Sequence, residues 1–467
     1  MLFFFDRLLP FPLMLFTTRQ VGASATNRFG EGRSVDDLTG AILTSKSGAL
    51  LRPNHLFILA LNLHKDSHEP SVTSQVSIMS VAIHFYFLLV FAILTSLTNS
   101  QSDRVQSNKN VAMFVLGDSV FDPGNNNFLN TSKAKANFPP YGETFFQYPT
   151  GRHCDGRILP DFAAAYAGLP YWRAYLEPNN HNFTVGANFA SAGAGALVET
   201  NGNGIPLEVQ LDYFKEVANL LKDQQGEADA KELLQGAIYY SSIGGVDLTS
   251  FAVSATNVTE SQIQDYVDIV IGNITDAVKE IYEMGGRKFA FQNVAPLGCV
   301  PGSKQSYNTS DCVESLQTIA TMHNNALNIV AQELASKLPG FNYLIFDFFN
   351  VVMDRIQNPK KYGFKEGDVA CCGSGPNRGS TTCGSLTSAY ELCSDPSEHV
   401  FFDLAHPTEA CNIQLIKLLW NGSTDVIWPI NLKELIELEI ETEIYSGNVD
   451  LLIDEQISID GVSKTYN

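Results

Sequence analysis

The stretch Val111-Ala-Met-Phe-Val-Leu-Gly-Asp-Ser119 joins an apolar run directly to a glycine, an aspartate and a serine. A short, continuous apolar run is typical of a strand that is buried on both faces of a parallel sheet. In open α/β sheets, ligands bind beyond the carboxyl ends of the strands. We therefore expect a central strand over 111–116 that delivers Ser119 to the functional edge of the sheet.

Further apolar runs alternate with longer segments of helical periodicity. The longer segments place apolar residues three and four positions apart, as in a helix that packs along one face. Strands separated by such helices predict βαβ crossovers and a largely parallel sheet covered on both faces. The expected strands are 111–116, 237–243, 288–293 and 343–349, and the expected helices are 260–284, 312–338 and 410–420.

The segments 122–150 and 363–397 are long irregular connections rich in glycine, asparagine and proline. Loops of this length usually carry a binding function or are pinned covalently. The second loop holds four cysteines, so covalent pinning is the expectation there. The domain is expected to close with 426–432, and 437–467 is expected to form an acidic, solvated tail.

A second polar segment, Asp403-Leu-Ala-His-Pro-Thr-Glu409, places a carboxylate three residues before an imidazole. A serine hydroxyl is a poor nucleophile until a base takes its proton, and a neutral imidazole acts as that base when its other nitrogen is held. Ser119, His406 and Asp403 thus offer nucleophile, base and orienting carboxylate. Hydrolysis of an ester is the first hypothesis.

The overall composition limits the classes of partner. The chain has 467 residues, of which 45% are hydrophobic, enough for a large core. Its formal net charge of −20 argues against nucleic acid as a partner, because phosphate binding requires clustered lysine and arginine. The acidity otherwise indicates only that the protein repels other anions.

The best targeting segment lies well inside the chain. Residues 81–97 have an apolar centre followed by small polar residues, which predicts a signal peptide over 79–100 with cleavage near Ser100. The apolar span is too short for a comfortable transmembrane helix, so we expect no stable membrane span in the mature form. For 1–78 two interpretations stay open: a start codon assigned too early, with translation beginning at Met79, or a long targeting leader.

Cysteines and glycosylation sequons support export. All eight cysteines follow the expected signal, and an even count in an exported chain favours disulfides. Zinc is a poor alternative because the chain has no Cys-x-x-Cys pair. Sequons that follow Met79 begin at Asn130, Asn182, Asn257, Asn273, Asn308 and Asn421. We expect a glycoprotein secreted to the apoplast, or delivered to the vacuole or another secretory compartment.

From about Asn110 to Leu435 the chain resembles the plant GDSL-type lipases and esterases of the SGNH hydrolase superfamily. The resemblance rests on seven collinear blocks of sequence, which are Phe114–Asn127, Gly151–Arg157, Gly186–Gly195, Ser242–Asp247, Pro296–Pro301, Cys371–Gly373 and Asp403–Glu409. It implies a three-layer α/β/α sandwich with a mainly parallel, flavodoxin-like sheet and the site at the strand carboxyl ends. The hydrolase domain is expected over 104–436.

The resemblance also implies the roles of the site residues. Ser119 would be the nucleophile, His406 the general base and then acid, and Asp403 the orienting residue. The backbone N–H groups of Ser119 and Gly193 would hold the oxyanion. The substrate would be a small-molecule or lipid ester, and no cofactor or metal is expected; protein partners stay unknown.

One position departs from the family pattern. The third oxyanion donor in the family is an asparagine in Gly-x-Asn-Asp, and this chain has Gly244-Gly-Val-Asp247, so Val246 supplies no side-chain donor. Loss of one such donor typically lowers kcat by about 10²–10³, or roughly 3–4 kcal/mol. The alternative function is therefore a catalytically impaired relative that acts as a binding or associated protein in plant defence.

Several other side chains carry structural expectations. We expect Asp118 and Asp247 to bond backbone near the site without being catalytic. The histidines 153, 181, 323 and 399 are expected at the surface or as satisfied polar residues. Phe145, Phe146 and Tyr148 either line an acyl groove or pack in the core. The disulfide connectivity stays open, with Cys299–Cys312 one local pair and Cys371 or Cys372 paired with Cys383 or Cys393.

Overall fold

A computed structural model describes residues 111–180, 182–200, 204–254 and 258–440. The expected leader 1–78 and signal peptide 79–100 lie outside the described residues, as does most of the expected acidic tail.

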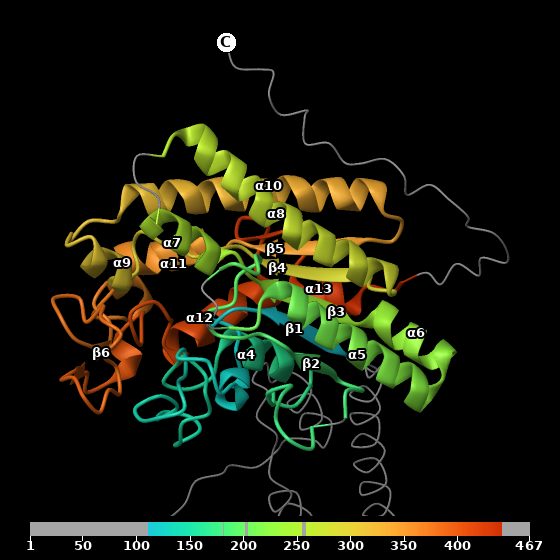
Figure 1. The fold of residues 1–467 in the computed structure, drawn as a ribbon, viewed down its shortest axis with the longest axis horizontal. Coiled ribbons are helices and arrows are strands. Elements are labelled where there is room, and N and C mark those ends of the chain that lie inside the picture. The colour runs from blue at the N-terminus through green and yellow to red at the C-terminus, as the bar shows by residue number, and fades with distance from the viewer. Residues whose placement is uncertain (1–110, 181, 201–203, 255–257, 441–467) are drawn as a thin grey trace, which may run out of the picture. The chain divides into compact units, whose positions relative to one another are not determined.

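A six-stranded sheet forms the centre of the domain, with the strand order β2-β1-β3-β4-β5-β8. Figure 1 shows the neighbouring strands β1 to β5 of this sheet. Strands β1 to β5 are parallel, and β8 runs antiparallel to β5 at the edge. The parallel part has the flavodoxin order, which confirms the expected fold class. The strands are β1 Met113–Gly117, β2 Gly186–Asn188, β3 Ile238–Ser242, β4 Lys288–Gln292, β5 Asn342–Phe346 and β8 Ile427–Trp428.

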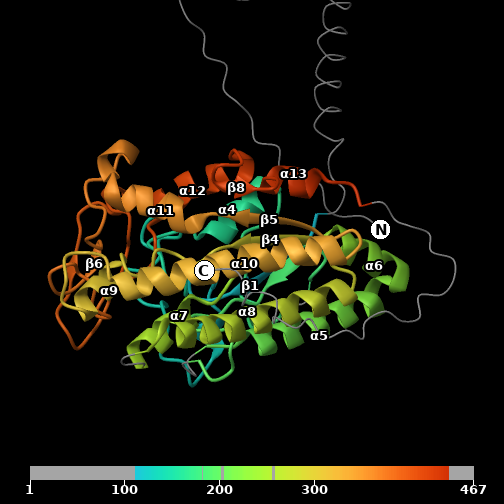
Figure 2. The same cartoon turned by 90° about the horizontal axis from the view of Figure 1, so that it is seen from above.

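Helices cover both faces of the sheet, which makes three layers (Figure 2). One apolar core lies between the sheet and the helices α5 Leu207–Gln225, α8 Glu260–Glu283 and α10 Glu314–Lys337. A second core lies on the other face, under α4 Leu159–Tyr166, α11 Phe348–Gln357, α12 Glu409–Asn421 and α13 Leu432–Glu437. The β1 residues divide between them, since Phe114 and Leu116 join the first core and Met113 and Val115 join the second.

The sequence located the long elements correctly and misjudged one boundary. The expected strand 343–349 ends at Phe346, because the Asp347 side chain accepts a hydrogen bond from the Asn350 N–H and caps α11. The other helices of the described residues are α6 Glu227–Gly236, α7 Gly245–Ser254 and α9 Pro301–Ser306, with short 3₁₀ turns at Asn125–Phe128, Pro359–Tyr362 and Pro396–Glu398.

Disulfides pin the loop 363–397, as expected. Cys371 bonds Cys393 and Cys372 bonds Cys383, around a small hairpin of β6 Cys372–Gly373 and β7 Glu391–Leu392. The third disulfide, Cys299–Cys312, closes the local loop before α10. Cys154 and Cys411 are buried and reduced, so the even cysteine count does not translate into complete pairing.

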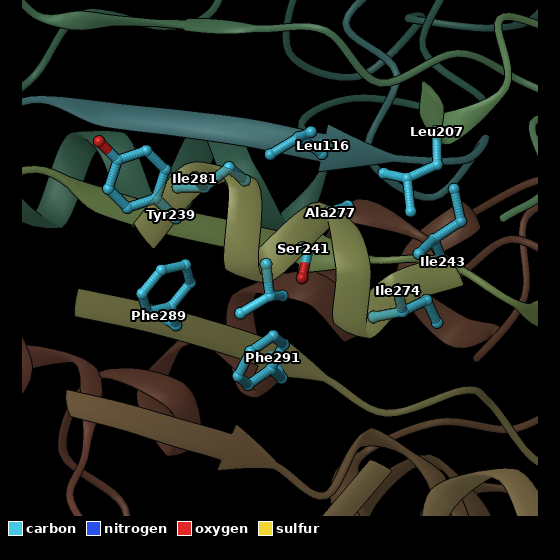
Figure 3. Close-up of a pocket in the computed structure, with 11 residues that line it drawn as sticks. Leu116, Leu207, Tyr239, Ser241, Ile243, Ile274, Ala277, Ile281, Phe289 and Phe291 are labelled. Atoms are coloured by element: carbon cyan, nitrogen blue, oxygen red, sulfur yellow. The ribbon is translucent and has the colours of Figure 1, made fainter. Parts of the chain in front are cut away.

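An apolar cavity lies inside the first core (Figure 3). Its walls come from β1, β3 and β4 on the sheet side and from α5 and α8 on the helix side, and they include Leu116, Phe289 and Ile274. Neither Ser119 nor His406 lines this cavity, so it is a packing space of the core and separate from the candidate site. Among the described residues, no helix combines the length and apolarity needed to cross a bilayer.

Candidate active site

Ser119 lies just beyond the carboxyl end of β1, in a tight turn. Gly117 is required there, because a Cβ at this position would lie 2.5 Å from the Ser242 carbonyl oxygen of β3. The Asp118 N–H donates to that same carbonyl, and the Asp118 carboxylate accepts from the Val120 N–H at 3.0 Å. Strand β1 is flanked by β2 and β3, so Ser119 stands at the point where the strand order reverses, where doubly wound sheets bind ligands.

A continuous hydrogen-bonded chain joins the three residues singled out from the sequence. The His406 Nε2 atom lies 2.7 Å from the Ser119 Oγ atom, across a separation of 287 residues. The His406 Nδ1 atom lies 2.6 Å from the Asp403 Oδ1 atom. Because Asp403 accepts at Nδ1, the Nε2 atom is left with a lone pair that faces the serine hydroxyl. This geometry suits removal of the hydroxyl proton.

Asp403 is held by more than its histidine. The backbone N–H groups of Ala405 and His406 donate to Oδ1 at 3.1 and 3.0 Å, and the Tyr141 hydroxyl donates to Oδ2 at 2.8 Å. Burial alone would raise the pKa of Asp403, but the charge and hydrogen bond of His406 outweigh it and hold that pKa well below its usual value. Burial and the Asp403 charge raise the pKa of Tyr141 well above 10, so its hydroxyl stays a donor. The sequence did not reveal this contact of Tyr141 with Asp403.

The electrostatics of His406 combine opposing effects. Burial lowers the pKa of His406, but the adjacent Asp403 charge and hydrogen bond, with a smaller contribution from Asp118, raise it to a net value above 6.5. Asp118 is itself buried, and burial raises the pKa of its carboxyl to about 6. Two carboxylates therefore favour the protonated form of the His406 imidazole.

The loop that carries His406 is fastened to the segment 151–157. The Asp155 carboxylate accepts from the Glu409 N–H at 2.8 Å, at the start of α12. The Glu409 carboxylate in turn accepts from the Arg157 backbone N–H at 2.7 Å and pairs with the Arg157 guanidinium at 2.6 Å. Thr408 caps α12 through the Cys411 N–H. These partners fix the backbone on the C-terminal side of the imidazole.

Backbone donors surround the region beside Ser119. The Ser191 N–H donates to the Gly117 carbonyl at 3.0 Å, which brings the turn at Gly193, with a φ of 82°, next to the nucleophile loop. Within the described residues, the N–H groups of Ser119 and Gly193 donate to no protein acceptor. Both N–H groups are therefore available to a ligand, as the oxyanion hypothesis requires.

Val246 lies half-buried in the first turn of α7, next to this region. A Cβ on the preceding Gly245 would lie 3.7 Å from the Asp118 carboxylate. On the other side, a Cβ on Gly244 would lie 2.5 Å from the His323 Nε2 atom, so the turn is tightly packed. Among the described residues, the N–H groups of Gly245 and Val246 have no acceptor.

The structure confirms some of the expectations for the other polar side chains. Asp118 and Asp247 do bond backbone, Asp247 through the Ala196 and Leu197 N–H groups. His399 is satisfied by the Val369 carbonyl, and His181 lies outside the described residues.

The expectation is wrong for His153 and His323, whose Nε2 atoms are buried without a hydrogen-bond partner. Burial, assisted by the nearby charge of His406, lowers the pKa of His153 to about 3, and burial lowers the pKa of His323 to about 4. Tertiary packing places these rings, and neither has a local sequence signal.

Phe145, Phe146 and Tyr148 of the 122–150 loop lie at or near the surface. Phe145 and Tyr148 are 40% and 63% exposed, which rules out packing of these two side chains in the core. Phe145 and Phe146 meet edge to face, and the Arg157 guanidinium lies 3.8 Å from the Phe145 ring centroid. The acyl-groove hypothesis stays a prediction.

The fold and site together define an α/β/α domain with a hydrogen-bonded serine, histidine and aspartate at the strand carboxyl ends. The family model for GDSL-like Lipase/Acylhydrolase matches residues 113–419, and the chain belongs to this family of esterases and lipases. It is 45% identical over 349 residues to a GDSL lipase of Tanacetum cinerariifolium, covering 74% of this chain and 93% of the relative.

Relatives from Arabidopsis thaliana include one named as an esterase/lipase and one named as inactive. GDSL esterase/lipase 1 is 42% identical over 368 residues, covering 77% of this chain and 98% of the relative. Inactive GDSL esterase/lipase-like protein 25 is 37% identical over 388 residues, covering 82% of this chain and 87% of the relative. The family alone therefore leaves open how active this member is.

Proposed function

We propose that this protein is a serine esterase that cleaves carboxylic esters through a covalent acyl-enzyme. The observation that carries the proposal is the hydrogen-bonded chain from Ser119 Oγ through the His406 ring to the Asp403 carboxylate. The names of the relatives, lipases and esterases, support an ester as the substrate class.

The chemistry follows from the geometry. As the Ser119 oxygen attacks the ester carbonyl, the His406 Nε2 atom takes the hydroxyl proton, and Asp403 stabilises the imidazolium that results. His406 then returns the proton to the leaving alcohol, and the acyl group stays on Ser119. A water molecule, deprotonated by the same nitrogen, releases the acid and restores the serine.

The oxyanion that forms during each attack would bind to the N–H groups of Ser119 and Gly193. Val246 stands where the family has an asparagine, so the side-chain donor is missing. The kcat of the proposed enzyme should therefore be lower than that of a site with three donors, by up to about 10²–10³-fold.

The alternative is an impaired relative that serves as a binding or associated protein in plant defence. Val246 favours it, and one relative is named inactive. The intact relay of Ser119, His406 and Asp403 favours the enzyme.

Hydrolysis of p-nitrophenyl esters of graded chain length by the purified protein separates the two functions. Turnover at any chain length that a serine-directed organophosphorus reagent blocks supports the esterase. Absence of turnover throughout the series supports the binding protein.

The pH dependence follows from the raised pKa of His406. Only the neutral imidazole can accept the serine proton, so kcat/KM should rise with pH as His406 loses its proton. The reference pKa is about 6.5, and because the folded pKa lies above that value, the acidic limb should have its midpoint above 6.5. Asp118→Asn, which keeps an acceptor for the Val120 N–H, should move the limb to lower pH. A midpoint at or below 6.5 in the parent protein would contradict this account.

We also propose that the domain over 104–436 is secreted after removal of 79–100. The disulfides support this, since they persist in oxidising compartments. The sequon asparagines that the structure describes, at 130, 182, 273, 308 and 421, are all exposed. Secreted material should begin near Gln101 and lose mass on treatment with an N-glycosidase. A mature protein that keeps Met1 and carries no glycan would refute the export route.

A further inference from the structure

His153 is a second imidazole next to the proposed catalytic one. The centroids of the His153 and His406 rings lie 4.7 Å apart, with an angle of 38° between the ring planes. The Nε2 atom of His153 is buried and has no hydrogen-bond partner. In a neutral imidazole one ring nitrogen carries the proton and the other a lone pair, so the tautomer protonated at Nδ1 leaves a lone pair on Nε2. A buried acceptor without a donor is costly, which marks this nitrogen as a place where something can bind.

His153 belongs to a cluster of metal-binding groups. One ligand atom each from His153, Asp403 and His406 lies within 4.8 Å of the others. Two imidazoles and one carboxylate suit a borderline divalent cation, which binds nitrogen and carboxylate oxygen at about 2.0–2.2 Å. Two atoms bound to one ion at that distance are at most about 4.4 Å apart, so the three side chains would move slightly closer together around the ion. Calcium and magnesium prefer sites built from oxygen ligands. The Asp403 carboxylate supplies a negative charge to a cation in this buried place.

We propose that His153, Asp403 and His406 form an inhibitory binding site for a borderline divalent cation such as Zn²⁺ or Cu²⁺. This inference rests on the proposed function, because it concerns regulation of the same site. The cation acts as an inhibitor and takes no part in ester hydrolysis.

Inhibition follows from the two nitrogens of His406. A cation between His153 and Asp403 would take the lone pair of the His406 Nδ1 atom, and the proton that Nδ1 carries would move to Nε2. The Nε2 atom would then donate toward Ser119 Oγ, which lies 2.7 Å away, and would have no lone pair for the serine proton. Substrate could still bind, so kcat should fall while KM changes little.

Zinc sulfate is titrated into the purified protein in a chelator-free buffer at constant pH, with magnesium sulfate as the metal control. Esterase kinetics give the effect on kcat and KM, and isothermal titration calorimetry gives the stoichiometry. We expect one zinc site per protein, loss of kcat that EDTA reverses, and no effect of magnesium.

His153→Phe keeps a planar ring and removes the lone pair, and His399→Gln removes a histidine outside the cluster as a matched control. The half-inhibitory zinc concentration should rise about tenfold or more in His153→Phe and stay unchanged in His399→Gln. His153→Gln provides a second test if the phenylalanine variant does not fold. Equal inhibition of the parent and both His153 variants, or no inhibition of the parent, would overturn the proposal.

Calorimetry on Ser119→Ala separates this inference from the proposed function. Ser119 is not a ligand, so that variant should still bind one zinc ion, whether or not the parent hydrolyses esters. Zinc binding without esterase activity would refute the enzyme and keep the cation site. Esterase activity without zinc binding would refute the cation site and keep the proposed enzyme.

Discussion

Ser119→Ala should abolish esterase activity, with a fall in kcat on the order of 10⁴–10⁶-fold. The alanine removes the atom that attacks the carbonyl, which stands 2.7 Å from the proposed base. The substitution deletes one oxygen from a side chain just beyond the carboxyl end of β1 and leaves the turn at Gly117 unchanged, so the fold should persist. The measurement is kcat on a p-nitrophenyl ester, with the melting temperature recorded alongside.

Ser191→Ala is the matched control. Ser191 is buried near the site, and its hydroxyl bonds the Asn126 side chain and the Ile205 N–H, away from the relay. It should lower the melting temperature more than Ser119→Ala and cost far less activity. Parent-like hydrolysis by Ser119→Ala would show that the nucleophile lies elsewhere.

Val246→Asn should raise kcat, by up to about 10²-fold, with little change in KM. The added amide would donate to an oxyanion that is fully formed only near the transition state, so the gain is differential binding. Asparagine and valine are similar in size, and position 246 is half-buried, so the amide keeps contact with water in the free protein. Steady-state kinetics on a soluble ester measure the effect.

Val246→Ala is the control for a change in packing without a donor, and it should not raise kcat. If the asparagine variant folds and its kcat is no higher than that of an already fast parent, another group must supply the third oxyanion donor. The structure offers the N–H groups of Gly245 and Val246, which have no acceptor among the described residues. Inactivity of both the parent and the asparagine variant would favour the binding-protein alternative.

The sequence revealed those parts of the site that depend on local order. Ser119 was found because an apolar run ends beside it, and Asp403 and His406 because a spacing of three residues lets one side chain reach the other. Tyr141 carried no such signal, since its hydroxyl meets Asp403 across 262 residues. The contact of Asp155 with Glu409 spans 254 residues and was equally invisible.

Prediction of the fold from sequence was likewise limited to features that depend on local order. Strands β1, β3, β4 and β5 are short and mostly apolar, and α8 and α10 are long and periodic, so pattern alone located them. Strand β2 has only three residues, Gly186–Asn188, and its identity comes from pairing with β1. The end of β5 was misjudged because the apolar pattern continues into α11, while the Asp347 cap decides the boundary.

The most direct test of the central claim is intact-protein and peptide mass spectrometry after treatment with a fluorophosphonate. An activated serine reacts with this reagent, whereas an ordinary surface serine does not. The account predicts one adduct per protein, located on Ser119 in the parent and greatly reduced in His406→Ala. A protein that stays unmodified, or an adduct on another serine, would contradict it.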